Sequence, residues 1–142
     1  MKLKMVVDEG CEIPCYAHEG DAGLDLRITE SVTLKPGERK MVPTGIRVAI
    51  PDGYVGLCFP RSGLASKLGI SLSNCVGVID SGYRGVVGAT LINLSDEEKR
   101  LEKGERVCQL VVVPYVCCEI EVVESLDDTE RGEGGFGSTG TR

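Results

Sequence analysis

Short β-branched runs, separated at fairly even intervals by turn residues, are the feature that most constrains how this chain folds. The clearest runs are residues 86–94 and 106–113, while residues 40–50 and 54–59 flank the turn Pro51-Asp52-Gly53. Helical periodicity is almost absent, and nineteen glycines with six prolines supply many tight turns. This pattern is typical of an all-β sandwich or barrel, and we predict that fold class.

Two shorter runs and one helix complete the expected elements. Residues 31–34 form one of these runs, and residues 119–123 alternate polar with apolar side chains, as a half-exposed strand does. The charged segment 95–105 is expected to be a loop. The single helix is expected from Pro60 to Lys67, because proline favours the first turn of a helix and the glycine that follows favours its end.

The chain is expected to form one domain with a tail. Residues 1–126 carry the predicted strands, whereas residues 127–142 are polar and rich in glycine, with Phe136 as their only aromatic side chain. A segment of this composition buries too little apolar surface to fold alone. We therefore predict a domain at residues 1–126 and a flexible tail at residues 127–142 that orders only against something else.

Charge and cysteine usage limit the possible partners and compartments. Sixteen basic and twenty-two acidic residues give a net charge of -6, which argues against general binding to nucleic acid or to an anionic membrane. No apolar stretch approaches the roughly 20 residues of a membrane span, and the N-terminus lacks the apolar region of a signal peptide. Cys58, Cys75 and Cys108 lie in apolar segments, as small buried thiols do in a reducing compartment, so a cytoplasmic protein is expected.

The tail contains a glycine pattern with several possible meanings. Residues 132–137 match G-x-G-x-x-G, but a dinucleotide fold needs that motif between a strand and a helix, and only five residues follow it here. A phosphate-binding P-loop is excluded because no lysine precedes Ser138 and Thr139. The remaining groups suit closure over a nucleotide, with Phe136 stacking on a base and Arg131 meeting phosphates. Composition alone equally allows a tail without a role.

Three further segments carry candidate chemistry. Arg61 and Ser62 stand where the predicted helix begins and offer donors to an anion, although an ordinary helix start has the same residues. Asp80 ends an apolar strand, which suits a general base, and Tyr83 offers a hydrophobic wall; a turn aspartate and a surface tyrosine are the alternative. Asp25 and the nearby Asp21 suit a magnesium ion held through water, or a solvated turn.

A zinc site or a cysteine nucleophile has less support. His18 lies near Cys11 and Cys15, but three ligands fall short of the usual four of a structural zinc site. No cysteine has an obvious base partner in the sequence.

Five segments together resemble the motifs of the trimeric dUTPase family, the deoxyuridine 5′-triphosphate nucleotidohydrolases. They occur in family order and span nearly the whole chain. The segments are Asp21-Ala22-Gly23-Leu24-Asp25-Leu26, Pro60-Arg61-Ser62-Gly63-Leu64-Ala65, Gly77-Val78-Ile79-Asp80-Ser81-Gly82-Tyr83-Arg84-Gly85, Lys103-Gly104-Glu105-Arg106-Val107-Cys108-Gln109-Leu110 and the glycine-rich tail.

The resemblance implies a fold, an assembly and a reaction. The fold is a distorted jelly-roll β-barrel or sandwich with one short helix, and the assembly is a homotrimer with active sites at subunit interfaces, each closed by a tail. The reaction is the Mg²⁺-assisted hydrolysis of dUTP to dUMP and pyrophosphate, which limits uracil incorporation into DNA and supplies dUMP for dTMP synthesis.

The resemblance also implies a role for individual residues. Asp80 would polarise a water for attack on the α-phosphorus, and Tyr83 would pack under the deoxyribose and exclude a 2′-hydroxyl. Asp25 would help hold Mg²⁺ through water, while the ion binds mainly to substrate phosphates. The hairpin residues implied to form the uracil slot are Asn74, Gly77 and Val78. The residues implied to contact the phosphates or to close over the nucleotide are Arg61, Ser62, Gly63, Gln109, Arg131, Phe136, Gly137, Ser138 and Thr139.

Two departures and two alternatives accompany this interpretation. Gly82 stands where many family members have a second acid, so any role of that acid is in doubt, and Leu24 replaces a common tyrosine. A dCTP deaminase-like enzyme shares the jelly roll but fits the uracil slot and the Phe136 tail less well. A nucleotide-sensing regulatory trimer is the non-catalytic alternative, against which Asp80 and Tyr83 count.

Overall fold

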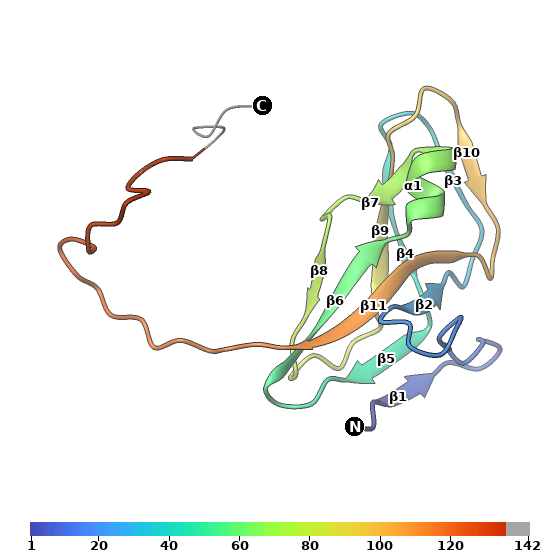
Figure 1. The fold of residues 1–142 in the computed structure, drawn as a ribbon. Coiled ribbons are helices and arrows are strands. Elements are labelled where there is room, and N and C mark those ends of the chain that lie inside the picture. Colours follow the sequence, from blue (N-terminus) through green and yellow to red (C-terminus); the bar gives the residue numbers. More distant parts are fainter. Residues whose placement is uncertain (136–142) are drawn as a thin grey trace.

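A computed structural model of the chain describes residues 1–135 and shows short antiparallel strands arranged as a barrel (Figure 1). The elements in chain order are β1 (Lys4–Val7), β2 (Leu24–Arg27), β3 (Val32–Leu34), β4 (Arg39–Pro43), β5 (Ile46–Ala49), β6 (Tyr54–Pro60), α1 (Ser62–Leu68), β7 (Ile70–Leu72), β8 (Gly77–Ile79), β9 (Gly88–Asn93), β10 (Lys99–Leu101) and β11 (Arg106–Pro114). The prediction of an all-β fold of the jelly-roll type with one short helix is confirmed.

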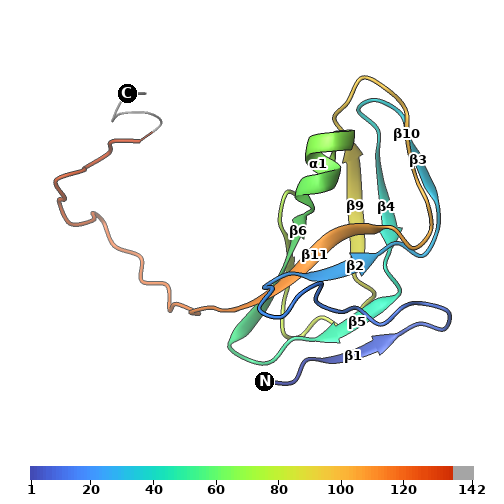
Figure 2. The same ribbon diagram turned by 45° about the vertical axis from the view of Figure 1, so that its right-hand side comes forward.

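Within residues 1–135 the strands form four antiparallel sheets. The largest has the order β2-β11-β6-β8, and a three-stranded sheet has the order β4-β9-β7. The pairs β1-β5 and β10-β3 lie at opposite ends of the barrel (Figure 2). Because neighbours in each sheet are mostly far apart in sequence, the fold depends on long-range pairing.

The barrel interior is filled by aliphatic side chains. Buried and part-exposed residues alternate along β2 and β5, as strands with one buried face require. Cys58 and Cys108 are buried in this core and behave as small apolar residues, as predicted. A hydrogen bond with Cys58, together with burial, raises the pKa of the Cys108 thiol, so Cys108 stays protonated. Cys75, by contrast, is exposed in a turn, and the prediction that it is buried is wrong.

One buried polar side chain closes a loop at the end of the core. Asn93 is fully buried, and its Nδ2 donates to the carbonyl oxygens of Leu34, at 2.9 Å, and Glu97, at 2.8 Å. Its Oδ1 accepts a hydrogen bond from the backbone N–H of Ser95 at 2.9 Å. The side chain thereby satisfies one backbone carbonyl of β3 and two backbone groups of the loop that follows β9.

Several sequence-based boundaries need correction. The run 40–50 is two strands, β4 and β5, because Gly45 takes a left-handed conformation with φ of 70° and turns the chain into another sheet. The segment 95–105 contains β10, which pairs with β3. The helix begins at Ser62, since Pro60 ends β6. Residues 119–123 form no strand and are exposed.

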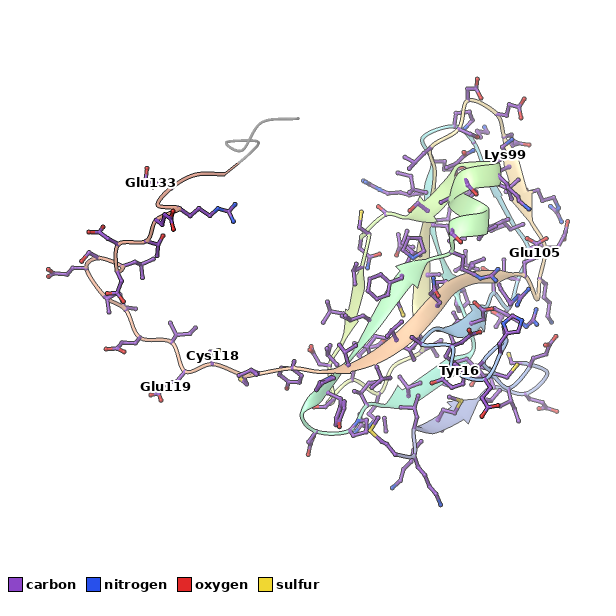
Figure 3. All side chains as sticks on the ribbon, viewed as in Figure 1. Tyr16, Lys99, Glu105, Cys118, Glu119 and Glu133 are labelled. Atoms are coloured by element: carbon purple, nitrogen blue, oxygen red, sulfur yellow. The ribbon has the colours of Figure 1, made fainter. Side chains whose placement is uncertain are left out.

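The chain leaves the barrel after β11 and continues as an extended segment. Residues 115–135 form no helix or strand, and their side chains are largely exposed; those of Cys118, Glu119 and Glu133 stand along the segment in Figure 3. Ile120 and Val122, for example, are 88% and 92% exposed. The domain boundary predicted at residue 126 stays a prediction. Within the described part of the chain, no helix is long and apolar enough to cross a membrane.

Candidate functional site

An open cleft of about 410 Å³ lies where β2, β11 and the β6–α1 junction meet. The sheet order places these strands side by side, with Gln109 of β11 opposite Asp25 of β2 on one side and Phe59 of β6 on the other. The cleft is lined by Ala17, His18, Asp21, Ala22, Gly23, Asp25, Arg61, Ser62, Gly63 and Gln109. The structure therefore brings together five residues predicted from separate motifs, namely Asp25, Arg61, Ser62, Gly63 and Gln109.

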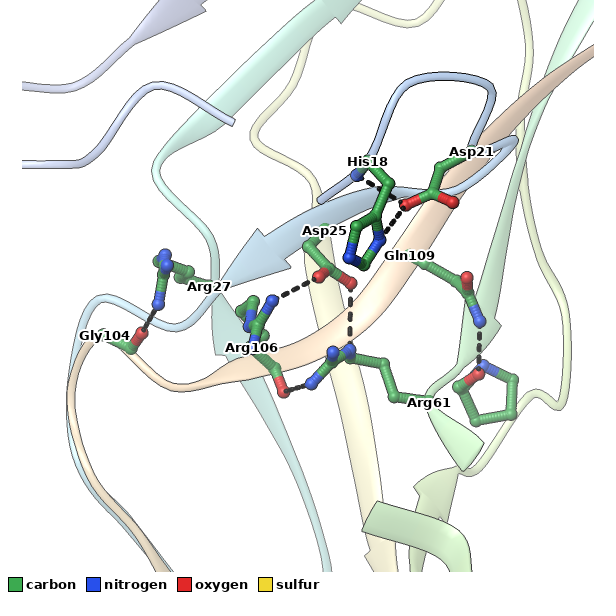
Figure 4. Close-up of polar contacts among 9 residues, drawn as sticks. His18, Asp21, Asp25, Arg27, Arg61, Gly104, Arg106 and Gln109 are labelled. Carbon is green, nitrogen blue, oxygen red and sulfur yellow. Dashed lines mark hydrogen bonds and ion pairs between the residues drawn. The ribbon is translucent and has the colours of Figure 1, made fainter. Parts of the chain in front are cut away.

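An ion cluster forms one wall of the cleft (Figure 4). One carboxylate oxygen of Asp25 lies 2.9 Å from Nε of Arg61, and the other lies 3.0 Å from Nη1 of Arg106. Arg61 also donates to the backbone carbonyl of Arg106 at 3.4 Å. The two guanidinium groups neutralise the Asp25 carboxylate and leave one net positive charge on this cluster, while Asp21 adds a second carboxylate to the cleft lining.

A close approach between two strands shapes the cleft floor. The Gln109 side chain donates through Nε2 to the Pro60 carbonyl at 3.2 Å and lies directly against Gly23. A Cβ at position 23 would collide with the Gln109 side-chain oxygen, so only glycine leaves Gln109 in this place.

Two cleft residues with polar side chains, His18 and Asp21, were not assigned to the site from the sequence. His18 Nδ1 lies 3.3 Å from the Asp21 carboxylate, and the His18 backbone N–H donates to the same carboxylate at 2.8 Å. Both residues line the cleft, although His18 was considered only as a zinc ligand and Asp21 only as one of two candidate acids. Asp21 opens the first motif and His18 lies three residues before it, and this position is the sequence signal that could have identified them.

A second group of predicted residues lies on β8 and the turns at its ends. Asn74 and the exposed Cys75 form the turn before β8, where the N–H of Val76 donates to the Asn74 carbonyl at 2.6 Å. Gly77 and Val78 belong to β8 itself, and Val78 is exposed. This hairpin is the segment predicted to form the uracil slot.

Asp80 and Tyr83 lie in the turn that follows β8. The Asp80 side chain is exposed, and its carbonyl accepts the N–H of Tyr83 at 3.1 Å. The Tyr83 hydroxyl donates to the Val86 carbonyl at 2.9 Å, which fixes the ring beside the turn.

The structure does not bring Asp80 to the cleft of its own chain. In the antiparallel pair β6–β8, Gly56 lies opposite Ile79, so Asp80 stands beside the start of β6. Arg61 follows the other end of β6, six residues beyond Val55, the position beside Asp80. At about 3.3 Å per residue, the two positions are separated by roughly 20 Å along the strand. A water bound to Asp80 is thus out of reach of a phosphate held by Arg61 of the same chain.

The tail residues fall into two groups. Arg131 belongs to the segment after β11, which runs away from the barrel (Figure 1), and its Nε donates to the Gly134 carbonyl at 2.8 Å. The predicted contacts of Phe136, Gly137, Ser138 and Thr139 lie outside the described residues.

The oxygen and nitrogen donors restrict how the site could hold a metal ion. Within residues 1–135, no three His, Cys, Asp or Glu side chains gather as a metal site, and both oxygens of Asp25 bind arginine. An ion coordinated directly by several protein ligands does not fit this arrangement. A magnesium ion held mainly by substrate phosphates, with one of its waters donating to a remaining lone pair of Asp25, does fit.

Comparison with known proteins identifies the family. A family model described as dUTPase matches residues 9–140. The deoxyuridine 5′-triphosphate nucleotidohydrolase of Cutibacterium acnes is 57% identical over 129 residues, which cover 90% of this chain and 85% of the relative. That of Finegoldia magna is 48% identical over 142 residues, 99% of each chain. Among solved structures, the Staphylococcus bacteriophage 80alpha dUTPase with dUpNHpp aligns with a TM-score of 0.90 at 34% identity and covers 98% of each chain.

Proposed function

Because the chain belongs to the dUTPase family, we propose that it hydrolyses dUTP to dUMP and pyrophosphate by a water attack for which Asp80 is the general base. The protein is a dUTP diphosphatase, as the names of its relatives indicate. The observation that carries the proposal is the cleft, in which Arg61 and Ser62 at the start of α1 meet Gln109 of β11. The reaction would limit uracil incorporation into DNA and supply dUMP for dTMP synthesis.

The cleft suits the triphosphate. The Arg61 guanidinium presents several N–H donors, the Ser62 hydroxyl is another donor, and Gln109 offers its amide from the opposite strand. Gly63 has no side chain and faces open space, which leaves room for phosphate oxygens. These groups would hold and orient the phosphates and leave the α-phosphorus open to an in-line attack.

The β8 hairpin suits the nucleoside. Asn74, Gly77 and Val78 would present donors and acceptors to the uracil edge, and Tyr83 would form the wall under the deoxyribose. Asp80 would accept the proton of the attacking water. Structures of the 80alpha phage dUTPase with dUpNHpp support this assignment, since they include variants at an aspartate and at a tyrosine three positions later, the spacing of Asp80 and Tyr83.

The distance between the phosphate cleft and the β8 hairpin of one chain supports active sites that are shared between subunits. Since Asp80 and Arg61 lie at opposite ends of β6, a complete site needs the cleft of one chain and the hairpin of another. A homotrimer supplies three such pairs, and a tail with Arg131, Phe136, Gly137, Ser138 and Thr139 would close each site. The domain would then be residues 1–126, and the tail residues 127–142.

Mixed trimers test the shared site. Arg61→Gln and Asp80→Asn chains are each expected to be nearly inactive alone, because every site lacks one group. After joint refolding, about a quarter of sites combine the intact cleft of an Asp80→Asn chain with the intact hairpin of an Arg61→Gln chain, since each choice has a probability of about one half. Turnover should therefore rise to about a quarter of the wild-type value, measured as pyrophosphate release.

The control mixture contains Arg61→Gln and the double variant Arg61→Gln/Asp80→Asn. Every cleft in it lacks Arg61, so no recovery is expected. If the first mixture shows only the summed activity of its parents, the site is not shared in this way.

Magnesium fits the phosphate side of the site. Asp25 would accept a hydrogen bond from a metal-bound water while Arg61 and Arg106 hold its carboxylate in place. When bound, the ion would neutralise phosphate charge that the protein cations leave uncompensated.

Pyrophosphate release from dUTP, dCTP, dTTP and UTP in the presence of magnesium tests the function and its specificity. Release from dUTP alone is expected: Tyr83 would exclude the 2′-hydroxyl of UTP, and the uracil slot would exclude the methyl group of dTTP and mispair with dCTP. Absence of pyrophosphate from all four nucleotides would contradict the proposed function, and ammonia released from dCTP would favour a deaminase.

The cytoplasm is the proposed place of action. All seven cysteines are free thiols, which suits a reducing compartment. Regulation of a partner protein remains the second candidate function. The phage 80alpha dUTPases, to which this chain is similar, are described as controlling the transfer of virulence genes.

A further inference from the structure

Arg106 binds the cleft carboxylate from the side that faces away from the cleft. Asp25 is only 13% exposed and lies between the cleft and a neighbouring cavity of about 360 Å³. Arg61 lines the cleft, whereas Arg106 lines only the neighbouring cavity, together with Arg27. Asp25 therefore lies between Arg106 and the space that the substrate phosphates would occupy.

The strand pairing explains how Arg106 reaches this place. In the β2–β11 ladder, Arg106 lies opposite Arg27, and the register then shifts before Cys108. The Arg27 Nε lies 3.1 Å from the Glu12 carboxylate, and its Nη1 donates to the Gly104 carbonyl at 2.7 Å. Arg27 makes no ion pair with Asp25. Two neighbouring arginines of similar exposure, 41% for Arg106 and 39% for Arg27, therefore have different partners.

The geometry fixes the orientation of Arg61 through two contacts that involve Arg106. The Arg106 side chain holds one oxygen of Asp25, so the other oxygen stays directed at Nε of Arg61. The Arg106 backbone carbonyl accepts a second bond from Arg61. Arg61 is itself the N-cap residue of α1, and its side chain makes no capping hydrogen bond to the helix, so the helix start does not hold the guanidinium.

We propose that Arg106 is a positioning residue for nucleotide binding: acting through Asp25, it aligns the Arg61 guanidinium with the substrate phosphates. The proposal rests on the proposed function, because it assigns Arg61 to the phosphates of dUTP. Loss of the Arg106 side chain frees one oxygen of Asp25 and lets the carboxylate rotate, so that the backbone carbonyl of residue 106 becomes the only fixed partner of Arg61 among the contacts described. It also removes one of the two positive charges that balance Asp25.

Arg106→Gln should raise KM for dUTP roughly tenfold and change kcat by less than about threefold. A hydrogen bond between charged groups corresponds to about this loss when the partly exposed position of Arg106 weakens it. Arg106→Lys should recover part of the loss, because lysine keeps the charge but lacks the planar fork of donors. Arg27→Gln is the matched control and should stay within about twofold of wild type.

A binding experiment separates this inference from the catalytic proposal. Titration of inorganic tripolyphosphate into the assembled protein by calorimetry needs no turnover, and Arg106→Gln should weaken binding roughly tenfold relative to Arg27→Gln. If wild-type protein releases no pyrophosphate but this difference is observed, the proposed function fails and the positioning role stands.

Two results would overturn the positioning role. One is equal tripolyphosphate affinity and equal KM in Arg106→Gln and Arg27→Gln. The other is a lower melting temperature for Arg106→Gln with unchanged KM, since that would make Arg106 a structural residue only. A rise in KM that Arg106→Lys partly reverses, at an unchanged melting temperature, supports it.

Discussion

Asp80→Asn is expected to keep dUTP binding near the wild-type strength and to lower kcat by roughly 10²–10⁴-fold, the usual contribution of a general base. The exposed Asp80 side chain stands in a turn and carries no fold-stabilising hydrogen bond within the described residues. Asparagine has nearly the same shape but does not accept the proton of the attacking water. The substitution thus removes the chemical step and leaves the phosphate cleft, at the other end of β6, intact.

The measurement is kcat and KM for pyrophosphate release, with a dUpNHpp titration to report binding without turnover. Asp96→Asn is the matched control, because Asp96 is an exposed loop aspartate between β9 and β10, away from the hairpin. Near-normal kcat in Asp80→Asn would remove the general-base assignment. A large loss of dUpNHpp binding would instead show that Asp80 holds the nucleotide.

The sequence predicts the fold class because the signals for it are local. Alternation of buried and exposed residues along β2 and β5, and turn residues between strands, follow from strand geometry alone. The gathering of Asp25, Arg61 and Gln109 was expected from the resemblance, and strand order explains it. The helix start was placed two residues early because Pro60 also suits the end of a strand.

The features that the sequence did not predict depend on pairing between distant strands. The short charged strand β10 has the composition of a loop, and its pairing with β3, far away in sequence, makes it a strand. The role of Arg106 depends on a register shift between β2 and β11, and no residue in the sequence predicts that shift. The distance between Asp80 and Arg61 follows only from the pairing of Gly56 with Ile79. Tertiary contacts decide these features, and local propensity does not.

Removal of residues 131–142 is expected to spare assembly and to lower kcat/KM for dUTP at least roughly a hundredfold, the scale of a lost positioning element. The cleft is open to solvent, with Ser62 and Gly63 both exposed. Water would therefore compete with Arg61 and Gln109 for the phosphates unless another segment covers them. Arg131 and the predicted contacts from Phe136 to Thr139 supply a ring, a guanidinium and hydroxyls suited to that cover.

The matched control removes only residues 140–142 and keeps every tail residue predicted to meet the nucleotide, so it should retain most of the activity. Sedimentation reports the mass of both truncated proteins, and pyrophosphate release reports their turnover. Because residues 115–130 remain in both, a loss of assembly on removing 131–142 would assign a structural role to the last segment. Unchanged turnover in an intact assembly would mean that the cleft and hairpin exclude water without the tail. A loss of turnover in an intact assembly is the result that closure of the site by the tail requires.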